Sequence, residues 1–202
     1  MRKFLHYLSI AAMVLATSAL ASCGDKEKGG DSTPTGTYKY EGRTQNIAVA
    51  FRNTWNDDGM TGHTIILSSD PAAGSNSDEP ASYFTIEFSD STLGKEFNLV
   101  NLPELGVDYD IYFVASENYD AYDYYGYEYD GEIYGYSEYK SNDTWDDATI
   151  TAGTFKATRS GNSFTVNISA TINGKSFACN YSGAPQIISA YSKADIKGSR
   201  MK

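Results

Sequence analysis

The stretch GTFKATRSGNSFTVNISATINGKSFACNYSG, residues 153–183, decides the fold. Asn173-Gly174 within it is the favoured dipeptide of a two-residue type I′ hairpin turn, because both positions of that turn need a positive φ. Placing the turn there fixes the register, and apolar residues then lie opposite apolar or aromatic ones: Ala170 opposite Phe177, Ile168 opposite Cys179, and Val166 opposite Tyr181. A shift of one residue would destroy this separation of faces. The stretch therefore predicts a hairpin with one buried face, and it predicts that Cys179 is a core thiol rather than a nucleophile.

A second turn at residues 159–162, RSGN, joins the run 154–158 to the same sheet as a three-stranded meander. Elsewhere the chain has no long segment with the 3.6-residue apolar period of a helix. It has short runs rich in Val, Ile, Thr, Phe and Tyr that are bounded by Gly, Asn, Asp and Pro, which is typical of an antiparallel all-β fold. The chain is therefore expected to be all-β, with a C-terminal meander.

Further strands are expected at residues 37–41, 46–52, 63–69, 82–89, 95–100 and 109–115. The turn around Gly42 joins the first two, and loops are expected at residues 53–62, 70–81 and 102–107. With the tyrosine-rich segment described below, this gives about ten strands, a number that suits a β-sandwich or, as the alternative, a closed β-barrel. The uneven strand lengths favour the sandwich.

The N-terminus has the layout of a secretory signal peptide over residues 1–22: a short basic start, an apolar run and then small residues. The apolar run is short for a helix that crosses a bilayer, which needs about 20 apolar residues. Leu20-Ala21-Ser22-Cys23 resembles the lipobox of bacterial lipoproteins. That resemblance implies cleavage before Cys23 and attachment of lipid to its thiol, and several acyl chains on one residue anchor a protein stably.

The rest of the chain divides into three segments. Residues 23–35 are charged and rich in Gly, Ser, Thr and Pro, which indicates a flexible tether. Residues 36–190 are expected to form a single all-β domain, and residues 191–202 a basic tail. Together with the lipobox, the meander resembles that of small β-rich lipoproteins of the Bacteroidetes, a group of unknown function. The resemblance implies an outer-membrane, lipid-anchored protein, either surface-exposed or periplasmic.

The net charge and the cysteines limit the kinds of partner and site that this chain can have. The net charge is −10, and removing residues 1–22 takes away Arg2 and Lys3, so the mature chain has −12. Nucleic acid demands clustered Lys and Arg, so nucleic-acid binding is excluded. If Cys23 is lipidated, Cys179 remains alone, so neither an internal disulfide nor a cysteine-based metal site can form.

The segment YDYYGYEYDGEIYGYSEY, residues 122–139, holds eight tyrosines and no Lys or Arg. Its Asp130-Gly131 is again a type I′ dipeptide, and the register around it predicts one face with cross-strand tyrosine pairs. The candidate binding residues are the tyrosines of that face: Tyr125, Tyr127, Tyr129, Tyr134 and Tyr136. Tyrosine offers a rigid ring and a hydroxyl at small entropic cost, so such a face could bind a glycan or a protein partner.

Two other interpretations of this segment stay open. The tyrosines could serve only the stability of the hairpin, since aromatic cross-strand pairs each contribute about 0.2–1 kcal/mol. The carboxylates, with Asp143, Asp146 and Asp147 downstream, could hold Ca²⁺ through oxygen ligands, although no spacing matches an EF-hand loop.

The sequence predicts no catalytic residue, no metal site and no cofactor. His63 is the only histidine outside the signal peptide and is expected at the edge of a strand, with no G-x-S-x-G elbow. No phosphate-binding loop or dinucleotide fingerprint is present. The chain is therefore expected to be a non-catalytic envelope lipoprotein that binds or presents a glycan or a protein partner. The alternatives are a structural or accessory subunit of an outer-membrane or fimbria-like assembly and, third, a hydrolase with two close carboxylates.

Overall fold

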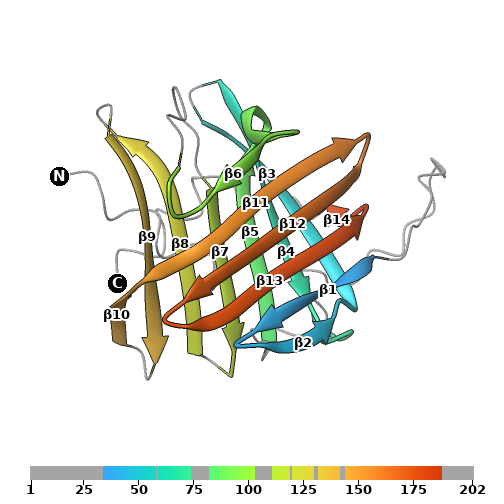
Figure 1. Cartoon of the computed structure of the whole chain (residues 1–202). Helices are drawn as coiled ribbons and strands as arrows, with labels where there is room; N and C mark the ends of the chain where they lie inside the picture. The colour runs from blue at the N-terminus through green and yellow to red at the C-terminus, as the bar shows by residue number, and fades with distance from the viewer. Residues whose placement is uncertain are drawn as a thin grey trace, which may run out of the picture.

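The computed structural model describes residues 34–57, 59–73, 82–102, 111–118, 120–129, 132–141 and 144–187, without the side chains of 57, 127–129, 132–134, 136 and 145. Two β-sheets pack face to face within these ranges, which confirms the predicted all-β sandwich (Figure 1). The strands of the described residues divide into two separate sheets, so the alternative of a closed barrel is wrong for this part of the chain. The predicted signal peptide, nearly all of the tether and the basic tail lie outside the described residues.

One sheet has six antiparallel strands. In spatial order they are β2 (Arg43–Asn46), β1 (Thr35–Tyr40), β13 (Lys175–Gly183), β12 (Ser163–Ile172), β11 (Ile150–Ser160) and β6 (Glu96–Asn98). The predicted meander is β11–β12–β13, and its register is the one that Asn173-Gly174 predicts, with Ile168 opposite Cys179. Both turn residues adopt a positive φ, 50° and 70°.

The other sheet has eight strands and lies behind the first in Figure 1, with its strands crossing those of the meander at a pronounced angle. In spatial order they are β10 (Thr144–Ala148), β9 (Glu132–Ser141), β8 (Asp120–Tyr129), β7 (Ile111–Glu117), β5 (Ser82–Ser89), β4 (Met60–Ser68), β3 (Val49–Asp57) and β14 (Gln186–Ile187). All neighbours are antiparallel except β14, which runs parallel to β3. A short 3₁₀ helix, η1 (Asp90–Thr92), follows β5.

Two predicted boundaries were wrong, and the described residues form 14 strands rather than about ten. The expected strand 46–52 is split, because the chain crosses between the sheets at Ile47-Ala48: Ile47 N donates to Gly36 O (3.1 Å) in one sheet and Ala48 N to Ser68 O (2.9 Å) in the other. The expected loop 53–62 is instead the β3–β4 hairpin. Its polar residues reflect exposure near the tip of the hairpin rather than an absence of strand.

The core lies between the two sheets and is dominated by aromatic rings. Its largest fully buried side chains are Tyr38, Tyr124, Tyr181, Phe84, Phe88, Phe113, Phe155, Phe164 and Phe177. Cys179 is also fully buried, as predicted. Each such aromatic side chain contributes about 1.5–3 kcal/mol through burial of apolar area. The burial pattern of β12 alternates residue by residue, as expected for a strand with one face on the core.

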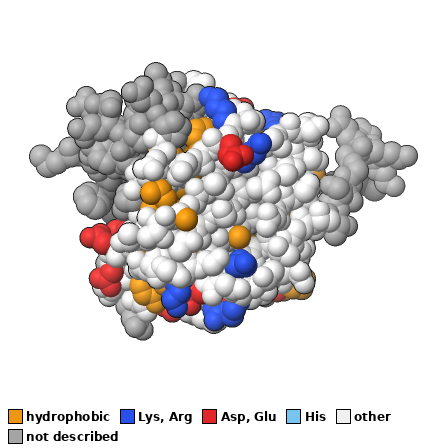
Figure 2. All heavy atoms as spheres, in the orientation of Figure 1, with side chains coloured by type: hydrophobic (Ala, Val, Ile, Leu, Met, Phe, Trp, Pro, Cys, Tyr) orange, Lys and Arg blue, Asp and Glu red, His pale blue; other side chains and the backbone are white. Residues whose placement is uncertain are grey.

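The outward face of the meander is polar and mostly uncharged, and Figure 2 shows it as a surface with few acidic or apolar side chains. Its exposed residues include Thr154, Lys156, Thr165, Asn167, Ser169, Asn180 and Ser182. Water can solvate these hydroxyl and amide groups, so this face needs no covering element.

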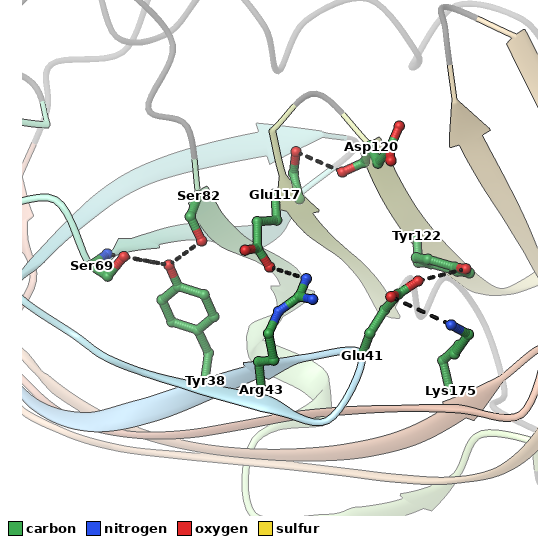
Figure 3. Close-up of polar contacts among 10 residues, drawn as sticks. Tyr38, Glu41, Arg43, Ser69, Ser82, Glu117, Asp120, Tyr122 and Lys175 are labelled. Atoms are coloured by element: carbon green, nitrogen blue, oxygen red, sulfur yellow. Dashed lines mark hydrogen bonds and ion pairs between the residues drawn. The ribbon is translucent and has the colours of Figure 1, made fainter.

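Polar contacts join the β1–β2 hairpin to the eight-stranded sheet at one end of the sandwich (Figure 3). Glu41 Oε1 accepts a hydrogen bond from the Tyr122 hydroxyl (3.1 Å), and Glu41 Oε2 lies 3.5 Å from Lys175 Nζ. Arg43 Nη2 lies 2.7 Å from Glu117 Oε2. The charged pairs are partly exposed, so each adds little to stability. Of these contacts, Arg43–Glu117 and Glu41–Tyr122 link the two sheets, whereas Glu41–Lys175 lies within the six-stranded sheet.

Candidate functional site

The tyrosine-rich segment forms the β8–β9 hairpin in the predicted register. Tyr125 lies opposite Tyr136, Tyr127 opposite Tyr134, and Tyr129 opposite Glu132. The turn residues Asp130 and Gly131 lie outside the described residues, as do the side chains of Tyr127, Tyr129, Tyr134 and Tyr136. The shared aromatic face of these four residues therefore stays a prediction, whereas Tyr125 can be placed by its contacts.

Three other tyrosines of the hairpin belong to the core. Tyr124 is fully buried, and its hydroxyl donates to Leu99 O at 2.9 Å. The Tyr122 ring lies 4.5 Å from the Tyr139 ring and 4.6 Å from Phe177, centroid to centroid. Such pairs stabilise by about 0.5–1.5 kcal/mol beyond burial. These tyrosines are structural, which accounts for part of the unusual composition.

Two glycines open the inner face of the hairpin for a crossing segment. Gly126 lies opposite Gly135, as the register predicted. A Cβ on Gly126 would lie 2.8 Å from Leu102 Cδ1 and 2.9 Å from the Tyr124 hydroxyl oxygen. A Cβ on Gly135 would lie 3.1 Å from Leu99 O. Only glycine leaves room for Leu99 and Leu102 to pack so closely against β8 and β9.

Tyr125 points away from the core and stacks on a tyrosine of the neighbouring strand. Its ring centroid lies 4.7 Å from that of Tyr112, at an interplanar angle of 35°. Both side chains are partly exposed. Tyr112 is a site residue that the sequence analysis missed. The alternation Ile111-Tyr112-Phe113, with the apolar residues inward, is the signal that could have placed it on the outer face.

Asp123 lies beside Tyr125 on the same face of β8 and binds its hydroxyl group. Its side chain is 1% exposed; Oδ2 accepts a hydrogen bond from the Tyr125 hydroxyl (2.8 Å), and Oδ1 accepts one from Glu138 N (3.1 Å). Burial raises the pKa of Asp123 to about 7, despite these hydrogen bonds. Because protein donors occupy both oxygens, the carboxyl group positions Tyr125 rather than acting as a free acid.

Carboxylates continue across the next strands in the same row. Asp123 lies opposite Glu138, which lies opposite Asp147. Burial, and then the charge of Asp147, raise the pKa of Glu138. In the part of the chain that the structure describes, no three His, Cys, Asp or Glu side chains are grouped so that they could hold a metal ion.

His63 was wrongly expected at a strand edge. It lies inside β4 (Met60–Ser68) and is 1% exposed, because His63, Ile65 and Leu67 share the inward face of that strand. Its Nε2 lies 2.7 Å from Asp90 Oδ1. Burial lowers the pKa of His63 below 6.5 even though Asp90 raises it, so the ring is neutral at pH 7. The contact is therefore a hydrogen bond rather than an ion pair.

Among the described residues, no helix has both the length and the apolar character needed to cross a bilayer. No protein-family model, no curated protein and no solved structure matches this chain.

Proposed function

We propose that this chain is a non-catalytic, lipid-anchored protein of the cell envelope that binds a glycan through the outer face of β7, β8 and β9. The observation that carries the proposal is the Tyr112–Tyr125 pair, two partly exposed rings whose centroids are 4.7 Å apart, with Tyr125 bound by the buried carboxyl group of Asp123. The lipobox at Cys23 supports the anchor, and the secretory layout of residues 1–22 supports export. The outer membrane as its location rests on the resemblance to lipoproteins of the Bacteroidetes.

The chemistry of this face suits a sugar. A pyranose ring presents an apolar C–H surface that packs on an aromatic ring, and its hydroxyl groups donate to carboxylates such as Glu138. Tyr125 is fixed by its hydrogen bond to Asp123, and Tyr112 by the stack. Side chains that are already ordered lose little conformational entropy on binding, which improves affinity.

The same geometry argues against the hydrolase alternative. A glycosidase needs one carboxyl group that can donate a proton and a second that acts as base or nucleophile. Asp123 has the raised pKa of a general acid, but its two oxygens accept hydrogen bonds from Tyr125 and Glu138. A carboxyl group held in this way supports the site instead of reaching a substrate.

The structural-subunit alternative needs a long open sheet edge for donation or capture of a strand. The outermost strands that the described residues form are short: β2 has four residues, β6 three, β10 five and β14 two. Among the described residues, β3 and β9 extend past β14 and β10, so parts of these two strands are open to another strand. No described feature of those edges points to a partner, whereas the tyrosine pair does, so we favour binding through the sheet face.

A glycan array with matched variants tests the proposal. Tyr112→Ala and Tyr125→Ala should each weaken glycan binding at least about tenfold, since each removes a stacking face. The pair Tyr127→Ala and Tyr134→Ala extends the test to the predicted remainder of the aromatic face. Asn167→Ala, on the outward face of the other sheet, is the control and should bind as the wild type does. Each variant should keep the far-ultraviolet circular dichroism of the wild type.

Two outcomes would contradict the glycan proposal. Equal binding by the wild type and both single variants would remove the tyrosine face from the site. An absence of binding to every glycan, with a protein captured through the same tyrosines, would favour a protein partner instead.

The anchor needs a separate test. Cells fed a radiolabelled fatty acid should label the wild-type chain, and Cys23→Ser should abolish that label. An unlabelled wild-type protein, or one recovered in the aqueous phase of a detergent phase separation, would contradict the lipoprotein assignment.

A further inference from the structure

Two arginines lie over the ring of Phe164 at the end of the sandwich where the β11–β12 hairpin turns. The Cζ atom of Arg52, from β3, is 5.2 Å from the ring centroid, and that of Arg159, from β11, is 5.4 Å away. The ring of His63 also contacts Phe164, at 5.0 Å between centroids. These residues come from both sheets, so the fold alone brings them together.

Arg52 is buried, with 6% of its surface exposed. Its Nε and Nη1 atoms make no hydrogen bond to any group in the described chain. The Tyr181 hydroxyl, in a side chain 2% exposed, is likewise without a hydrogen-bond partner among the described residues. A buried donor that lacks a partner destabilises the folded state, and more so when it is charged, so these three atoms need an explanation.

Packing against Phe164 explains only part of this arrangement. A cation–π contact attracts the guanidinium group to the ring face and stabilises it there. The N–H donors lie in the plane of the guanidinium, so the aromatic ring does not satisfy them. The contact therefore positions Arg52 and leaves its Nε and Nη1 atoms without a hydrogen-bond partner among the described residues.

The local charge is also unbalanced. Burial lowers the pKa of Arg52, and the nearby charge of Arg159 lowers it further, whereas Asp90 raises it. Asp90 lies 3.7 Å from Arg159 Nη1 and accepts the hydrogen bond of the neutral His63. Two guanidinium groups and one carboxylate leave an excess of one positive charge, in a chain whose net charge is −10.

We propose that Arg52, Tyr181 and Arg159 form a binding site for a small oxyanion group, a carboxylate or a sulfate, free or carried on a sugar. The oxygens of the anion accept hydrogen bonds from Arg52 Nε and Nη1 and from the Tyr181 hydroxyl, and its charge balances the second arginine. Arginine suits this role because its planar group donates several hydrogen bonds to carboxylate or sulfate oxygens.

The anion reaches this site from the rim. The side chains of Asp90 and Arg159 are 42% and 35% exposed, whereas Arg52 and Tyr181 lie deeper. Arg159 is therefore the arginine of the site that contacts solvent, and Arg52 is the buried one. The site is built on β3, β11 and β13, apart from the tyrosine face on β7 and β8, so it does not depend on the proposed glycan face.

His63 gives a direct spectroscopic reporter, because its ring contacts Phe164 and the full chain has only one other histidine, His6. The His63 Cε1–H resonance, assigned by its loss in His63→Asn, is followed during titration at fixed pH and ionic strength. Sodium sulfate and sodium D-glucuronate are the two anion probes. D-glucose and sodium chloride are the neutral and simple-halide controls. A saturable shift with sulfate, glucuronate or both supports the site, and their relative affinities separate a free anion from an acidic sugar.

Variants of single side chains locate the binding. Arg52→Met should weaken anion binding at least tenfold, and Tyr181→Phe, which removes one hydroxyl group from an otherwise intact core, about threefold to tenfold. The control is Arg43→Met, which removes an exposed arginine that is paired with Glu117 and lies outside the proposed site. This variant should bind the anions as the wild type does. Because a ligand that binds only the folded state stabilises it, sulfate should also raise the Tm of the wild type and of Arg43→Met but not of Arg52→Met.

The proposal is overturned if neither sulfate nor glucuronate gives a saturable shift, or if chloride gives the same shift. It is also overturned if Tyr181→Phe and Arg52→Met bind both anions with wild-type affinity. If Arg52→Met does not fold, Arg52→Lys and Tyr181→Phe decide the outcome, since lysine keeps the charge but loses most of the donors and should bind more weakly.

Discussion

The Tyr125 hydroxyl donates a 2.8 Å hydrogen bond to Oδ2 of Asp123, which lies two residues earlier on the same face of β8. Successive residues of a strand alternate in direction, so a spacing of two places both side chains side by side. Burial raises the pKa of Asp123 to about 7. Tyr125 is therefore hydrogen-bonded to a carboxyl group that changes charge near neutral pH.

This shift makes the stability of the domain depend on pH. In the unfolded chain Asp123 ionises near its ordinary pKa of 3.8, whereas in the folded chain it keeps its proton to about pH 7. Stability is therefore fully present below pH 3.8 and is lost as the pH rises through 7, by up to about 4 kcal/mol from this group. Asp123→Asn should remove that loss: its free energy of unfolding should exceed that of the wild type at pH 8 and match it near pH 4.

Urea denaturation at several pH values measures the free energy of unfolding of Asp123→Asn and of the wild type. In the difference between the two values, the contributions of all other titrating groups cancel. Asp146→Asn, an exposed acid on β10, is the control and should follow the wild type at every pH. A wild type that is as stable as Asp123→Asn at pH 8 would contradict the raised pKa.

The glycine pair of the hairpin gives a prediction on packing. Gly126→Ala places a Cβ 2.8 Å from Leu102 Cδ1 and 2.9 Å from the Tyr124 hydroxyl oxygen, so the domain should lose about 1–3 kcal/mol. Gly135→Ala meets its nearest atoms at 3.1 Å and should cost less. Chemical denaturation of the two variants gives this order directly. A reversed order, or no loss for Gly126→Ala, would show that the segment at Leu99–Leu102 does not pack here as described.

The hairpins could be predicted because their turns fix both conformation and register. Asn173-Gly174 allows positive φ at two positions, and alternation of apolar residues then identifies the buried face of β12 and β13. The same reasoning gave the pairing of Tyr125 with Tyr136. These are local relationships, and local sequence suffices for them.

Features that depend on contacts between the two sheets could not be predicted, because the residue pattern of a single strand does not encode those contacts. The run from Asn46 to Phe51 stays compatible with one strand, although the chain changes sheets at Ile47-Ala48. Arg52, Arg159 and Tyr181 were missed for the same reason: they lie on β3, β11 and β13, and only the packing of the sandwich brings them together. Tyr112 is different, because its partner Tyr125 lies on the neighbouring strand of the same sheet and local alternation could have placed it.

Cys179 should be unreactive in the folded protein. Its thiol is fully buried, and burial raises its pKa well above the usual range, so almost no thiolate forms. In the Cys23→Ser chain, a chromogenic disulfide reagent should give no reaction under native conditions and one equivalent in guanidinium chloride. Rapid reaction of the native protein would show that β13 opens or that the thiol is accessible.

His63 should titrate below its ordinary pKa of 6.5, because burial outweighs the hydrogen bond to Asp90. The unfolded chain then binds a proton before the folded chain does, so this residue costs stability as the pH falls below about 6.5. Asp90→Asn removes the carboxylate that raises the pKa of His63, so this variant should lower that pKa further. Asp70 is an exposed acid after β4, and Asp70→Asn should leave the pKa of His63 unchanged. Nuclear magnetic resonance titration of the His63 Cε1–H signal measures all three proteins. A pKa at or above 6.5 in the wild type would mean that the ring carries its proton inside the sandwich, and that Asp90 binds it as an ion pair.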